Sequence, residues 1–93
     1  MHLLKKRLEK WRNSRIVVVD TDGMLELTEK NLLAIIGEDH PDFKEFKRIV
    51  SLFRVVDYHP FELGAYDEVD KWNDAKQEMV QLLQRVIREH EEK

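Results

Sequence analysis

The sequence predicts one α+β domain over residues 1–93, mainly helical, with about four helices and one small β-hairpin at residues 15–27. Three observations support this fold class. Apolar residues recur at helical spacing in four segments. A β-branched run followed by an Asp-Gly pair indicates the hairpin. A chain of 93 residues with 42% hydrophobic residues is long enough for one modest core.

The first expected helix covers residues 2–13 and is basic. Leu4, Leu8 and Trp11 share one face, while lysine and arginine cover the other. Residues 1–19 hold six basic residues and one acidic residue, whereas the remainder holds ten basic and eighteen acidic residues. A basic arm beside an acidic body suggests contact between them, within one chain or between two; the alternative is a solvated helix face.

The hairpin is expected where the run at 15–19 is followed by Asp-Thr-Asp-Gly at 20–23. Valine and isoleucine favour a pleated strand, and Asp-Gly suits the positive φ values of a tight turn. Residues 24–27 would form the return strand. Because an isolated hairpin is marginally stable in water, helices should cover one of its sides.

Three more helices are expected, over residues 28–37, 41–54 and 67–91. Thr28 is the predicted N-terminal cap of the first of them, because its hydroxyl can accept a hydrogen bond from a backbone amide. Gly37 is placed to end that helix in the left-handed conformation. Asp39 or His40 would cap the next helix, and Pro41 suits its first turn.

The sequence of the last expected helix also predicts self-association. Its apolar residues approach a heptad pattern over two repeats. A helix of ~25 residues spans ~37 Å. Because a body of this size has a radius of gyration of only ~12 Å, the helix could extend past its own core. We therefore expect a homodimer in which the apolar stripe of this helix packs against a second copy. The self-association residues would be Val69, Trp72, Met79, Leu83 and Val86.

Segment 57–74 interleaves acidic and aromatic side chains, which is typical of a surface that binds a basic protein partner. The partner-binding residues would be Tyr58, Phe61, Tyr66, Asp67, Asp70 and Trp72. In the alternative interpretation, the aromatic residues anchor the segment to the core and the acids cap the last helix. The predicted function is a non-enzymatic protein-interaction module, such as a bacterial or phage-type regulator or inhibitor.

Residues 28–54 suggest a second function, a helix-turn-helix DNA-binding regulator. One side of the second helix carries basic and hydroxyl side chains: Lys44, Lys47, Arg48, Ser51 and Arg54. Carboxylates surround the start of the same helix: Glu38, Asp39, Asp42 and Glu45. They would repel phosphate where a recognition helix approaches DNA, so a solvated or intramolecular surface is favoured and nucleic acid is not an expected partner.

Residues 16–25, an apolar run that leads into Asp-Thr-Asp-Gly, resemble the first motif of haloacid-dehalogenase-like phosphatases. The resemblance implies that Asp20 is a nucleophile and Asp22 an acid/base, both near a magnesium ion. The family normally has threonine after the glycine, where this chain has Met24, and 93 residues leave no room for the α/β domain with the remaining motifs. A β-turn is the favoured interpretation, and no enzyme is expected.

No cofactor or metal is expected, and neither is membrane contact. The four histidines lack the spacing of a zinc site, and the chain has no cysteine. No apolar run of ~18 residues could span a membrane, and the charged N-terminal residues do not resemble a signal peptide. We expect a cytoplasmic protein whose first helix packs on its own body, not on lipid.

Overall fold

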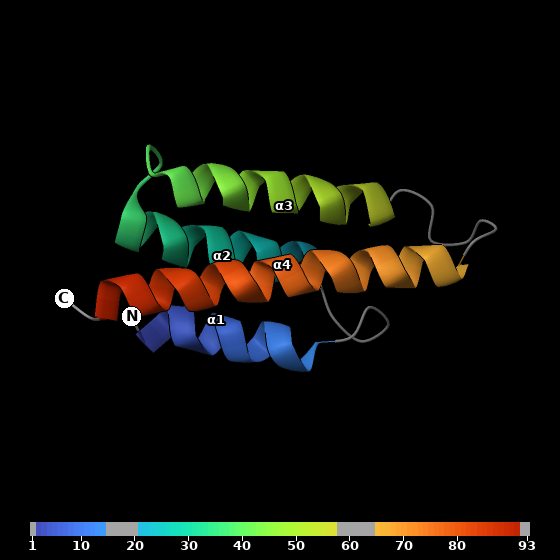
Figure 1. The fold of residues 1–93 in the computed structure, drawn as a ribbon, viewed down its shortest axis with the longest axis horizontal. Helices are drawn as coiled ribbons and strands as arrows, with labels where there is room; N and C mark the ends of the chain where they lie inside the picture. The colour runs from blue at the N-terminus through green and yellow to red at the C-terminus, as the bar shows by residue number, and fades with distance from the viewer. Residues whose placement is uncertain (1, 15–20, 58–64, 92–93) are drawn as a thin grey trace.

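The computed structural model describes residues 2–14, 21–57 and 65–91, and every regular element among them is a helix (Figure 1). The helices are α1 (His2–Asn13), α2 (Thr21–Ile36), α3 (Pro41–Asp57) and α4 (Ala65–Glu91). Each helix packs against two others, in the order α1, α2, α3, α4 and back to α1. The result is a four-helix bundle that measures 47 × 24 × 18 Å along its principal axes.

Neighbouring helices in the bundle run antiparallel. Lys5, near the start of α1, pairs with Glu91 at the end of α4. Asp42, near the start of α3, pairs with Arg85 toward the end of α4. A short turn at 37–40 reverses the chain between α2 and α3, so these two helices lie side by side in opposite directions (Figure 1). The bundle therefore has up-down-up-down topology.

The predicted β-hairpin at residues 15–27 is wrong. Residues 15–20 lie outside the described part of the chain, but residues 21–27 form the first turns of α2. Burial gives the physical reason, because Thr21, Leu25, Thr28 and Leu32 are all buried and recur at intervals of four, three and four. This period places all four on one helix face, where α2 meets the core. Thr28 is therefore an interior residue of the helix and not its cap.

The other helices agree closely with the bounds expected from their apolar periodicity. The first is observed at His2–Asn13, the third ends at Asp57 instead of residue 54, and the fourth begins at Ala65 instead of residue 67. Gly37 follows α2 with a φ of 78°, as predicted for a left-handed helix end. His40 caps α3, since its Nδ1 accepts a hydrogen bond of 3.0 Å from the backbone amide of Asp42.

One end of the core, where α1 and α3 end and α2 and α4 begin, contains three fully buried aromatic residues. The ring of Phe53 lies 5.0 Å from that of Trp11 and 5.7 Å from that of Trp72, measured between centroids. Trp11 Nε1 donates a hydrogen bond of 3.0 Å to Thr28 Oγ1, and Trp72 Nε1 donates one of 3.3 Å to Thr21 Oγ1. Helix α2 thus supplies the acceptor for each buried indole N–H.

Candidate functional site

The acidic-aromatic surface expected in segment 57–74 falls only partly within the described residues. Tyr58 and Phe61 lie outside them. Tyr66 and Asp67 belong to the first turn of α4. The described side chains therefore include only two of the expected partner-binding residues, Asp70 and Trp72.

The remaining two residues of that expected surface have opposite environments. Asp70 is exposed on α4. Trp72 is fully buried, and its indole N–H is bonded to Thr21 of α2. A side chain that is enclosed by its own bundle contacts a partner only if the bundle opens, so Trp72 acts in this structure as a core residue.

The residues expected to mediate self-association also lie in the core of a single chain. Trp72, Met79, Leu83 and Val86 have no exposed surface, and Val69 lies near the start of α4. The apolar stripe of α4 exists as predicted, but α1 and α3 of the same chain cover it. These four side chains are not available to a second copy.

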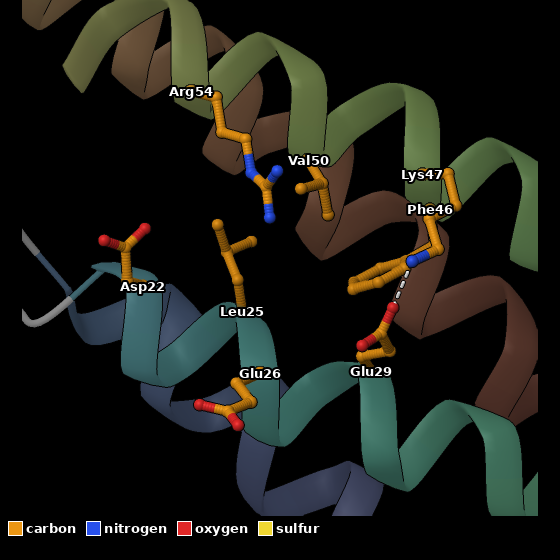
Figure 2. Close-up of a pocket in the computed structure, with 8 residues that line it drawn as sticks. All are labelled: Asp22, Leu25, Glu26, Glu29, Phe46, Lys47, Val50 and Arg54. Carbon is orange, nitrogen blue, oxygen red and sulfur yellow. Dashed lines mark hydrogen bonds and ion pairs between the residues drawn. The ribbon is translucent and has the colours of Figure 1, made fainter. Parts of the chain in front are cut away.

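A surface groove lies between α2 and α3, and it is the most promising site among the described residues. One part has a volume of about 520 Å³, and Figure 2 shows the residues that line it: Asp22, Leu25, Glu26, Glu29, Phe46, Lys47, Val50 and Arg54. A second hollow shares Glu29 and Lys47 and adds four residues nearer the turn between the helices: Leu33, Glu38, Phe43 and Lys44. We call the two together the α2–α3 groove.

The centre of the α2–α3 groove is apolar. Leu25 and Phe46 reach it from the core, where both are nearly fully buried. Val50 is half-buried between them and the surface. Leu33 is 41% exposed and borders the second hollow. Water in contact with these side chains could be displaced by an apolar partner at a gain of about 25 cal/mol per Å².

The two sides of the groove carry opposite charges. The acidic edge, on α2, consists of Asp22, Glu26 and Glu29. Their spacing of four and three places them on one stripe of the helix. The basic edge, on α3, consists of Lys44, Lys47 and Arg54, spaced by three and seven. Sequence reasoning missed the acidic edge because residues 22 and 26 were assigned to a hairpin, where they would not share a helix stripe.

One ion pair crosses the groove, and other charges on its edges are available. Lys47 Nζ binds Glu29 Oε1, as the dashed line in Figure 2 marks, and lies 5.4 Å from the centre of the Phe43 ring. Figure 2 also shows Arg54 reaching from α3 toward α2, with Asp22 on the opposite side. Within the described segments, neither Asp22 nor Arg54 forms an ion pair.

The other side of α3 uses its charges to hold α4. Arg48 donates to Glu45 on its own helix and to Glu78 on α4. The hydrogen bond from Arg48 lowers the pKa of Glu45, and the two carboxylates together raise the pKa of Arg48. Arg85 of α4 binds the buried carboxylate of Asp42 at 2.7 Å. Helix α3 is therefore held to α4 by charged contacts, whereas the α2–α3 groove lies on its α2 side.

The helix-turn-helix hypothesis meets an unfavourable geometry. DNA-binding motifs of that type cross their two helices at about 90–120°, whereas α2 and α3 run side by side and antiparallel (Figure 1). Two of the basic residues proposed to contact DNA are already paired within the chain, Lys47 with Glu29 and Arg48 with Glu45 and Glu78.

The phosphatase resemblance also lacks its expected surroundings. Asp22 lies in the first turn of α2, and Asp20 falls outside the described residues. In the part of the chain that the structure describes, no three His, Cys, Asp or Glu side chains come together in a way that could hold a metal ion. His40 and His90 approach each other, with ring centroids 6.2 Å apart, but they belong to no such group.

Comparison with known proteins gives no further direction. Over the described residues, no helix combines the length and the apolar character needed to cross a bilayer. No protein-family model, no curated protein and no solved structure matches this chain. The α2–α3 groove is consequently the feature from which its function has to be argued.

Proposed function

We propose that the protein is a non-enzymatic protein-interaction module, acting in the cytoplasm as a regulator or inhibitor, and that its α2–α3 groove binds an amphipathic helix of a partner protein. One observation carries the proposal. The groove combines an apolar centre with an acidic edge on α2 and a basic edge on α3. This combination is the one that a helix with an apolar stripe and charged flanks would complement.

The dimensions of the groove support a helical occupant. Helix α2 has 16 residues and therefore a length of about 24 Å, or about four turns. A docked helix of similar length would place apolar residues at i, i+3, i+4 and i+7 over Leu25, Val50 and Leu33. Its basic flank would face the acidic edge and its acidic flank the basic edge, which fixes both the register and the direction of docking.

The openness of the groove favours a macromolecular partner over a small substrate. Sites for small molecules usually enclose most of the ligand and bring a few polar groups together at one point. Here the charged groups are distributed along two helices, with Asp22 and Arg54 at one end and Lys44 at the other. Such a distribution suits contacts repeated along an extended partner.

The proposal can be tested by photo-crosslinking in cells of the source organism. A photoreactive amino acid at Glu26, beside the groove, should give one discrete crosslinked product. The same group at Gln81, exposed on α4, serves as the control position and should not give that product.

Two matched leucine variants make the test specific. Leu33 and Leu27 are both on α2 and are 41% and 46% exposed, but only Leu33 borders the groove. Leu33→Asp should reduce the product at least about tenfold, the effect of losing ~1.4 kcal/mol of binding, whereas Leu27→Asp should leave it unchanged. An unchanged product in Leu33→Asp, the same product from Gln81, or no product at Glu26 would refute the proposal.

A further inference from the structure

We infer that α2 and α3 of a second copy of this chain cover the α2–α3 groove, so that the protein forms a two-fold dimer through these helices. The inference rests on the proposed function, because it names the partner for the same groove. The self-complementary arrangement of charge on the two edges carries it. The interface of this homodimer is thus the exposed α2–α3 groove and not the apolar stripe of α4, which is buried within one chain.

Opposite charges are matched across the groove at two levels. The Glu29–Lys47 ion pair fixes one level, because it joins the two helices directly. Asp22 lies seven residues before Glu29, and Arg54 lies seven residues after Lys47. Since the helices are antiparallel and rise ~1.5 Å per residue, both lie ~10.5 Å from the ion pair and in the same direction. Asp22 therefore lies at the level of Arg54, so an acid faces a base at both levels.

This pattern selects one symmetric arrangement. If two copies face each other with the two-fold axis parallel to the helices, α2 of each copy lies on α3 of the other, and every level is retained. Asp22 then faces Arg54 of the second copy, and the same contact occurs twice, as two-fold symmetry requires. An axis perpendicular to the helices would instead place α2 on α2, and the acidic edges would repel each other.

The apolar centre of the groove gives the dimer its remaining contact. Leu33 and Val50 would lose contact with water when the second copy covers them. Because Leu33, at 41%, is the only exposed leucine among the described residues that line the groove, the charged edges have a large share in holding the two copies together. The dimer should therefore weaken as salt screens these charges.

Two charge-reversal variants test the arrangement. The acid-reversed variant carries Asp22→Lys and Glu26→Lys, and the base-reversed variant carries Lys44→Glu and Arg54→Glu. The Glu29–Lys47 pair is left intact because it joins the helices within one chain. Sedimentation should give the wild type a mass that rises toward twice 11.2 kDa as its concentration rises to about 0.5 mM. Each variant alone should remain monomeric.

Mixing the two variants gives the decisive result. In the mixture, the lysine at position 22 of one variant faces the glutamate at position 54 of the other, the two altered edges carry opposite charge overall, and the unaltered edges also match, so an equimolar mixture should restore the dimer. A destabilised α2 cannot produce this recovery, and circular dichroism verifies that each variant is folded. The control, Asp74→Lys with Glu89→Lys, makes the same charge change on exposed residues of α4 and should leave the dimer unchanged.

The possible failures can be told apart. A wild type that stays monomeric over the whole concentration range overturns the inference, as does a dimer that the reversed variants retain or that their mixture does not restore. If the photoreactive group at Glu26 nevertheless joins the chain to a different protein, the proposed function stands with another occupant. If it gives no product, both the inference and the proposed function are refuted.

Discussion

At the scale of single residues, Thr28 shows how one buried hydroxyl can connect two helices. Its Oγ1 accepts a hydrogen bond from Trp11 Nε1 at 3.0 Å and donates one to the backbone carbonyl of Met24 at 2.7 Å. A hydroxyl has one donor and can accept at its lone pairs, so both roles are satisfied at once. Thr28 is fully buried, which means that no water can replace either bond without disturbing the packing.

Replacing this hydroxyl by a methyl group should destabilise the protein through the indole N–H that it leaves without an acceptor. Thr28→Val keeps the shape of the side chain but should lower the free energy of unfolding by about 1–3 kcal/mol, as measured by urea denaturation. In a Trp11→Phe background the same change should lower the free energy of unfolding clearly less, because there is no indole N–H to be left without an acceptor. Equal costs in the two backgrounds would show that the hydrogen bond is not the cause.

The sequence alone could not assign Thr28 correctly. A threonine before an apolar run has the same pattern whether its hydroxyl caps a helix or accepts a bond inside the core. The deciding partner, Trp11, is 17 residues away, and only the packing of α1 on α2 brings the two together. By contrast, the cap formed by His40 is local, and the sequence predicted it as one of two candidates.

At the scale of elements, the helices with the clearest apolar periodicity were the ones whose bounds the sequence predicted best. Helices α1, α3 and α4 have 12, 17 and 27 residues, and their apolar stripes outweigh any competing local signal. In residues 21–27, the Asp-Gly pair and the preceding valines indicated a hairpin. In the helix, Asp22 is favourably placed in the first turn, and Gly23 costs only about 0.5–1 kcal/mol. Burial of Leu25 and Thr28 exceeds that cost, and this burial depends on tertiary contacts.

The turn between α2 and α3 depends on the backbone of Gly37. Its φ of 78° is unfavourable for residues with a Cβ, yet no atom beyond the two adjoining residues lies within 4 Å of the position that a Cβ would take. Gly37→Ala should therefore lower the free energy of unfolding by about 1–2 kcal/mol through backbone strain alone. Gly37→Asn should cost less, because asparagine tolerates this conformation. If alanine and asparagine cost the same in thermal denaturation, backbone strain is not the cause.

At the scale of the whole molecule, the sequence predicted where the helices lie, apart from the first turns of α2, but not which surface the bundle leaves open. The stripe of α4 looked available for a second copy because its residues are apolar and regularly spaced. In the bundle, α1 and α3 cover Met79 and Val86, while Leu33 borders the groove with 41% of its surface exposed. Which apolar face stays exposed depends on how the helices pair, and a periodicity read along one segment carries no information about pairing.

The aromatic contacts should also make the bundle unfold as one unit. Phe53 of α3 contacts Trp11 of α1 and Trp72 of α4, and α2 supplies the hydroxyls for both indoles. Tryptophan fluorescence reports on this cluster, whereas far-ultraviolet circular dichroism reports on all four helices, so the two urea transitions should coincide. Phe53→Ala should shift both together by about 3–5 kcal/mol.

The neighbouring residue provides the control for this cooperativity. Leu52→Ala removes an apolar side chain that is 36% exposed, and it should change the free energy of unfolding much less than Phe53→Ala. If Phe53→Ala shifted only the fluorescence transition, the aromatic end would unfold independently of the rest. The contacts of Trp11, Phe53 and Trp72 argue against that outcome, because none of the three helices they join can separate without exposing a buried ring to water.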